Sequence, residues 1–177
     1  MRKLIDGDYD TICSTFDEWI ASCELPVEIN INYEVDIENR TILLDVDLPE
    51  IEDLPDTIMI KTDSGNLKEK KKTQTEKRGE YATCVFGLAV FISGSAFNIS
   101  PYIEKALISG YTQRRDKIGN VSDDYIYSIK IPRSAFEGKV EPSKTNPQEF
   151  CMSFINRCNI TSTSLFKVIK PYETYEM

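Results

Sequence analysis

The first fifty residues change from a helical to a strand period. Between residues 8 and 23, apolar side chains recur at intervals of three and four residues, which predicts an amphipathic helix that ends before Pro26. From there the period is two, because apolar positions alternate with polar ones. This alternation predicts an antiparallel hairpin with strands at residues 27–35 and 42–48.

A long helix is predicted in the middle of the chain. Residues 49–56 have the composition of an irregular acidic connector, and residues 57–62 that of a short edge strand. Apolar residues then recur at helical spacing from Lys70 to Phe97. These positions define one buried side of a helix, whose members are Tyr81, Cys84, Val85, Leu88, Phe91, Ile92 and Ala96.

A second hairpin and a further helix complete the predicted fold. The hairpin has strands at residues 106–113 and 124–131, and the helix covers residues 147–157. This order predicts an α+β fold in which two antiparallel β-hairpins form a sheet, packed against the long central helix plus N- and C-terminal helices. We expect residues 1–177 to form a single domain, because a chain of this length with 41% apolar residues can bury a core without cross-links.

Cysteine and histidine usage narrows the function classes. The five cysteines form no CxxC pair, and the N-terminus lacks the apolar run of a signal peptide, so we expect free thiols in the cytoplasm. No stretch approaches the roughly 18 apolar residues of a membrane span, so no membrane partner is expected. The chain has no histidine, which excludes Ser-His-Asp and Cys-His catalysis within it. No metal or other cofactor is expected.

The net charge of −8 is unevenly distributed. Residues 1–60 carry 3 basic and 16 acidic side chains, whereas residues 61–78 carry 7 basic and 3 acidic ones. Because the acidic part repels phosphate, a nucleic-acid surface would have to lie on the basic segment or in the C-terminal half. The basic run either contacts phosphate or an acidic protein, or is the solvated start of a helix; its members are Lys68, Lys70, Lys71, Lys72, Lys77 and Arg78.

One pattern formally matches metal-dependent nucleases. Residues 55–56 and 69–71 fit PD…(D/E)xK, in which two carboxylates hold Mg²⁺ and a lysine supports the attacking water. In such sites the second half lies on a strand of the sheet, whereas here it belongs to a polar, solvated run. Acids that alternate with apolar residues along a strand, as Asp45 and Asp47 do, usually face solvent. The alternative function is a small nuclease-like enzyme that uses a lysine and two of the acids Asp45, Asp47 and Asp56.

The second hairpin concentrates side chains that hydrogen bond and stack. Surfaces that combine tyrosine, arginine and adaptable polar groups suit binding. Ordinary pairing between neighbouring strands on an exposed sheet face explains the same composition equally well. The side chains concerned are Tyr111, Gln113, Arg114, Arg115, Asp123, Asp124, Tyr125 and Tyr127.

Four stretches resemble an uncharacterised bacterial domain. They are Val35–Pro55, Lys77–Tyr81, Ile108–Tyr127 and Leu165–Tyr172. In some proteins this domain precedes an Mrr-type restriction-endonuclease domain that carries the catalytic residues. The resemblance therefore implies an accessory role without nuclease activity, in phage defence or nucleic-acid transactions. It places family-like polar positions at Arg78, Tyr81, Gly110, Tyr111, Gln113, Arg114, Asp123 and Asp124.

The leading hypothesis is a non-catalytic binding or assembly module. In it, the second hairpin and the basic start of the long helix contact a protein or nucleic-acid partner. The expected binding residues are Arg78, Tyr81, Tyr111, Gln113, Arg114, Arg115, Asp123 and Asp124. The hypothesis requires Arg78, Arg114, Arg115 and Lys117 to form one patch. A scaffold that works only as a homo-oligomer is a further possibility.

Overall fold

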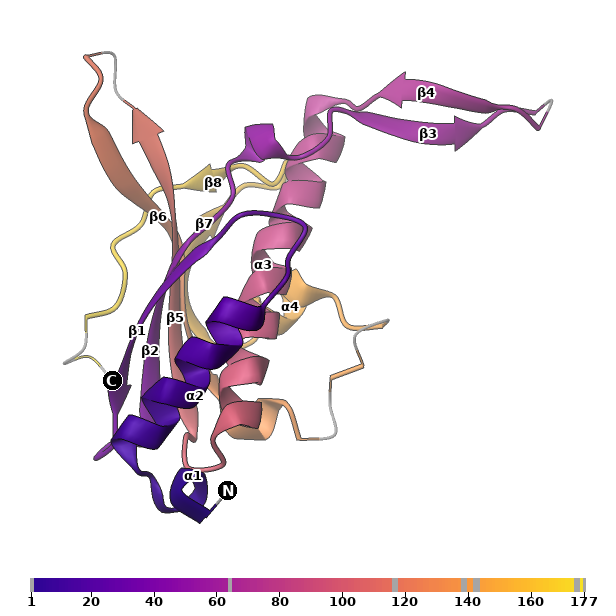
Figure 1. Ribbon diagram of the computed structural model, residues 1–177. Coiled ribbons are helices and arrows are strands. Elements are labelled where there is room, and N and C mark those ends of the chain that lie inside the picture. Colours follow the sequence, from indigo (N-terminus) through magenta and orange to yellow (C-terminus); the bar gives the residue numbers. More distant parts are fainter. Residues whose placement is uncertain are drawn as a thin grey trace.

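The chain folds into one large sheet with helices on a single face and a narrow β-ribbon that projects from the body (Figure 1). The computed structural model describes residues 2–63, 65–115, 118–137, 140–141, 144–173 and 176. Its helices are α1 (Arg2–Asp6), α2 (Tyr9–Ser22), α3 (Gln74–Ile99) and α4 (Pro147–Met152), with 3₁₀ turns η1 (Ile51–Asp53) and η2 (Arg133–Ala135). Its strands are β1 (Asn30–Asp36), β2 (Thr41–Asp47), β3 (Thr57–Lys61), β4 (Leu67–Lys71), β5 (Lys105–Arg115), β6 (Val121–Pro132), β7 (Ile155–Ile160) and β8 (Phe166–Lys167).

The six-stranded sheet has the order β1-β2-β5-β6-β7-β8. The two predicted hairpins, β1–β2 and β5–β6, are both antiparallel and lie side by side. They are joined by parallel pairing of β2 with β5, and α3 makes the crossover between these strands. The predicted α+β class, with two hairpins against a long central helix and with terminal helices, is confirmed.

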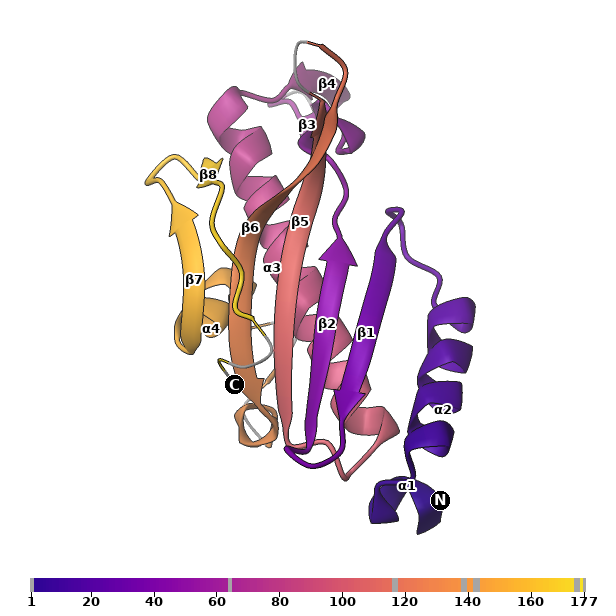
Figure 2. The ribbon, with the colours of Figure 1, turned by 90° about the vertical axis from the view of Figure 1, so that its left-hand side faces the viewer.

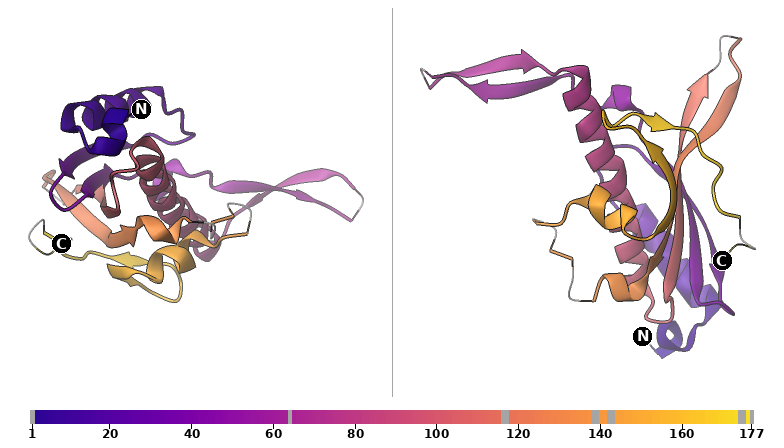
Figure 3. Two further views of the ribbon diagram at one scale, coloured as in Figure 1. Left: turned by 90° about the horizontal axis from the view of Figure 1, so that it is seen from below. Right: turned by 180° about the vertical axis from the view of Figure 1, so that it is seen from behind.

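The hydrophobic core lies between the sheet and α3. Ile42, Val46, Ile108 and Ile129 point from the strands toward the helix and are at most 1% exposed. Figures 2 and 3 show that the other face of the sheet carries no helix, and that the C-terminal segment after β8 runs across it. The sheet therefore has a buried helix-covered face and an open face.

From Tyr81 onward, helix α3 is apolar almost all the way round. Among the described residues it is the one helix that is long and apolar enough, by length and composition, to cross a membrane, and half of its most apolar window is buried in this fold. The prediction that no stretch approaches a membrane span is therefore wrong for residues 74–99. The helix is apolar because the sheet, α2 and α4 all pack against it.

Two predicted boundaries are wrong. The long helix begins at Gln74 and not at Lys70, because the Thr73 hydroxyl and the Glu76 carboxylate form a capping box there. The segment before it is strand β4. The helix predicted for residues 147–157 ends at Met152, and β7 follows, because pairing with β6 holds its residues extended.

Candidate binding site on the open sheet face

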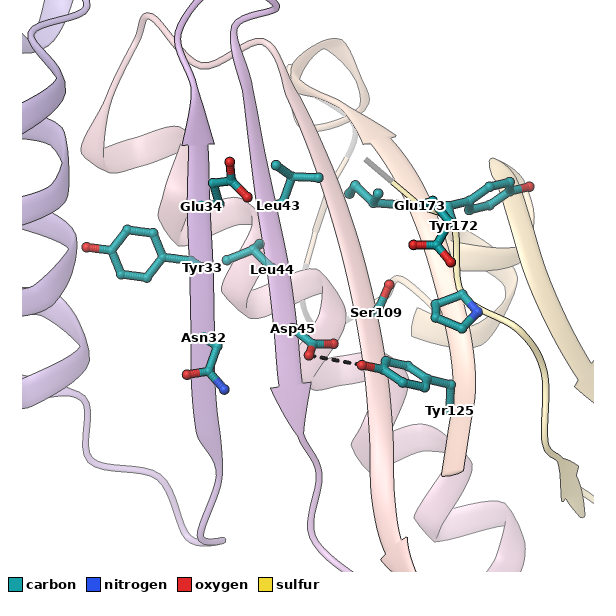
Figure 4. A pocket seen from close by; sticks show the side chains of 12 residues that line it. Asn32, Tyr33, Glu34, Leu43, Leu44, Asp45, Ser109, Tyr125, Tyr172 and Glu173 are labelled. Carbon is teal, nitrogen blue, oxygen red and sulfur yellow. Dashed lines mark hydrogen bonds between the residues drawn. The ribbon is translucent and has the colours of Figure 1, made fainter. Parts of the chain in front are cut away.

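A groove of about 350 Å³ lies on the open face of the sheet. It crosses β1, β2, β5 and β6 and is bounded on one side by the C-terminal segment (Figure 4). Because side chains alternate along a strand, residues that flank the buried core positions point into it. The residues that line the groove are Asn32, Tyr33, Glu34, Leu43, Leu44, Asp45, Leu107, Ser109, Tyr125, Pro171, Tyr172 and Glu173. Of these, Leu44 belongs to the buried core, and the Tyr33 side chain points toward α2 (Figure 4).

Asp45 is the groove carboxylate that hydrogen bonds to another lining side chain. Its Oδ2 accepts a hydrogen bond of 3.0 Å from the Tyr125 hydroxyl (Figure 4). Burial nevertheless raises the pKa of Asp45, and the negative charges of Asp123 and Asp47 raise it further. Burial and Asp123 likewise raise the pKa of Asp47. The groove therefore has a negative potential that would be relieved by a bound cation.

The C-terminal segment is held on the sheet by two cations. The Tyr172 ring lies between them, with its centroid 4.4 Å from Lys130 Nζ and 4.0 Å from the Arg157 guanidinium carbon. Arg157 also pairs with Glu176 at 2.7 Å and donates to the Pro171 carbonyl at 2.9 Å. These cations are thus occupied by the segment itself. Among the described residues, no ion-pair partner faces Glu34, Asp45 or Asp47.

Asp45→Asn is expected to stabilise the protein at pH 7. The folded-state pKa of Asp45 is raised, so its ionised form is disfavoured by folding, and this penalty disappears as the pH falls through that pKa toward the unfolded value. Asparagine keeps an acceptor for Tyr125 without the charge. We expect the Tm at pH 7 to rise by about 2 °C, and the Tm gain to shrink toward pH 4. A Tm that falls at pH 7 in thermal scans would contradict this account.

The predicted binding residues divide between the two faces of the sheet. Tyr111 and Asp123 lie near the groove. The centroid of the Tyr111 ring is 5.4 Å from that of Tyr125. The negative charge of Asp123 helps to raise the pKa of Asp45 and of Asp47. Gln113 lies at the same end of the sheet, and its backbone N–H donates to the Glu50 carboxylate at 2.8 Å.

Three further members lie on the helix-covered side. Arg78, Tyr81 and Arg114 line a cavity of about 60 Å³ together with Glu50. Arg114 reaches Asp124 at 3.7 Å. The Tyr81 hydroxyl is buried without a hydrogen-bond partner among the described residues. The structure thus brings Arg78, Tyr81 and Arg114 together, but separates them from Tyr111 and Asp123.

The four-residue basic patch is seen only in part. Arg78 and Arg114 border the same cavity, whereas the Arg115 side chain and all of Lys117 lie outside the described residues. Two arginines beside a small cavity are not an extended basic surface. The leading hypothesis therefore gains no support from this patch.

The residues of the nuclease pattern lie in two separate surroundings. Asp45 and Asp47 are on the open face, where their charged neighbours are other acids. Asp56 lies at the base of the projecting ribbon and pairs with Lys77. Residues 69–71 are part of the exposed strand β4 and not of a helix start. Within the described part of the chain, no three His, Cys, Asp or Glu side chains are placed to hold a metal ion.

Sequence reasoning missed the groove itself. The alternation along residues 27–48 places Glu34, Asp45 and Asp47 on one side of the first hairpin. Nothing local indicates that β5 pairs in parallel with β2, or that residues 171–173 fold back over the sheet. Comparison with protein-family models, curated proteins and solved structures finds no match to this chain.

Proposed function

We propose that the chain is a non-catalytic binding and assembly module whose open sheet face receives an extended, lysine-bearing segment of a protein. The observation that carries the proposal is a groove with three carboxylates, Glu34, Asp45 and Glu173, around the apolar side chains of Leu43 and Leu107. A lysine combines an apolar stem with a cationic end, and so suits a lining of this kind. The same acids repel phosphate, which favours a protein over a nucleic acid at this face.

The raised pKa of Asp45 supports this assignment. A carboxylate that is partly buried beside two other acids lowers the stability of the fold. Such a destabilising group is typical of a site where a partner binds the charge. The five cysteines are free thiols, which suits the reducing cytoplasm that we propose as the location.

The proposal is tested with a fluorescein-labelled peptide of alternating lysine and leucine. We expect salt-sensitive binding by fluorescence anisotropy, and a Kd at least about tenfold weaker in the Glu34→Gln, Asp45→Asn double variant. The matched control is Glu18→Gln with Glu24→Gln, two exposed acids on the α2 side of the molecule, and it should leave the Kd unchanged. Equal binding by the groove variant, or by a glutamate–leucine peptide, would refute the proposal.

A further inference from the structure

The β3–β4 ribbon stands apart from the body of the protein. Its two antiparallel strands extend away from the start of α3, on the helix side of the sheet (Figures 1 and 3). Every residue of both strands is exposed. An isolated two-stranded ribbon is only marginally stable in water. A projecting ribbon of this kind is therefore expected to gain order and stability from a surface that covers it.

One face of the ribbon combines exposed apolar and cationic side chains. The register pairs Lys61 with Leu67, Met59 with Glu69 and Thr57 with Lys71, so these six side chains lie on the same face. Met59 is 58% exposed and Leu67 is 70% exposed. We call these six side chains the ribbon face; its two lysines, Lys61 and Lys71, outnumber its one acid, Glu69. Neighbouring apolar groups exposed to this extent mark an interaction surface.

The lysines of the ribbon face are available to a partner. Lys70 and Lys72 are paired with Glu76 and Glu80 at the base of the ribbon. Among the described residues, Lys61 and Lys71 have no ion pair. The surface that fits them must offer carboxylates next to apolar side chains. The groove on the open sheet face offers both.

We propose that the ribbon face of one copy docks in the open-face groove of a second copy. This inference rests on the proposed function and names the lysine-bearing segment. The ribbon projects on the helix side of the sheet, whereas the groove opens on the other side, so it points away from the groove of its own copy (Figures 1 and 2). The contact joins two different surfaces, and such head-to-tail contacts build rings or open chains.

A second copy fits the ribbon better than a nucleic acid does. The ribbon face carries two lysines and one acid, Glu69, beside the apolar Met59 and Leu67, whereas phosphate binding calls for several cations along a backbone. The chain carries a net charge of −8, which opposes the approach of a polyanion. Between copies, the local charges of ribbon and groove attract one another.

The inference is tested by a charge swap in the full chain. Sedimentation equilibrium at about 200 µM, where an interface of ~10 µM affinity is largely formed, should give a mass above that of the monomer. The ribbon variant Lys61→Glu, Lys71→Glu and the groove variant Glu34→Lys, Glu173→Lys should each be monomeric. Their equimolar mixture should associate again, because both contacts then pair opposite charges. The control Arg2→Glu, Lys3→Glu, which makes the same charge change on α1, should assemble like the wild type.

Four outcomes would overturn the inference. They are a monomeric wild type at that concentration, unchanged assembly by either variant, no recovery in the mixture, and loss of assembly in the α1 control. All substituted side chains lie on the surface, and circular dichroism verifies that each variant is folded. If the wild type stays monomeric but binds the lysine–leucine peptide, the self-docking fails and the proposed function stands. If the wild type instead binds a DNA or RNA duplex and the ribbon variant does not, the ribbon is a nucleic-acid-binding surface and the self-docking is wrong.

Discussion

Replacing Phe86 with alanine should lower the free energy of unfolding by about 4 kcal/mol, in the range measured when a large buried side chain is truncated. Phe86 has no exposed surface. Its ring lies 5.7 Å from those of Tyr127 and Phe166, so it joins α3 to β6 and β8. The cavity left behind is enclosed by rigid rings and cannot collapse easily. Urea denaturation measures the change.

Phe91→Ala is the matched control for this truncation. Phe91 is on the same helix but is 43% exposed, and its ring meets only the edge of the core near Trp19, at 5.8 Å. We expect it to cost about 1 kcal/mol, because less surface leaves water at this position. If the two variants lose equal stability, α3 does not face the sheet as described.

Gly110→Ala should cost about 3 kcal/mol, at the upper end of the usual cost of overpacking a core. A Cβ at this position would lie 2.5 Å from Cζ of Tyr127 and 2.6 Å from Cδ1 of Leu48. The Tyr127 ring is fully buried and its hydroxyl donates to the Val85 carbonyl at 3.3 Å, so the ring has no free space to move into. Thermal and urea unfolding both report the loss.

The position next to Gly110 shows why this glycine matters for the site. The pairing of β5 with β6 shifts between Gly110 and Tyr111, so Ile126 is an extra residue on β6. The shift turns Tyr125 toward Asp45 on the open face while Tyr127 stays in the core. A variant that displaces Tyr127 should therefore also disturb the groove.

Gly87→Ala is the corresponding control. Gly87 lies inside α3, and a Cβ there would have no neighbour within 4 Å. Alanine should therefore increase stability by up to about 1 kcal/mol, the difference in helix propensity. A stabilising Gly87→Ala together with a destabilising Gly110→Ala would show that close packing, and not the loss of a glycine as such, decides the outcome. If Gly110→Ala is neutral, the close approach of Tyr127 is wrong.

Periodicity in the sequence was sufficient to predict the strands in which apolar and polar residues alternate clearly. Residues 27–35 and 42–48 each have a period of two on either side of a short polar turn, so both the hairpin and the side on which Glu34 and Asp45 lie could be predicted. It failed at residues 147–157. Phe150, Phe154 and Cys158 fit a helical spacing, but Phe154 follows the end of α4 and Cys158 pairs with Tyr127 from β7.

The sequence by itself determined the α+β class, the two hairpins, the long helix and the acidic character of the first third of the chain. Only the tertiary structure decided that β2 pairs in parallel with β5, that residues 67–71 form a ribbon with β3, and that the segment around Tyr172 closes one side of the groove. The reason is physical. Periodicity records which side of an element is buried, whereas strand order and the position of a returning segment depend on contacts between residues far apart in the chain.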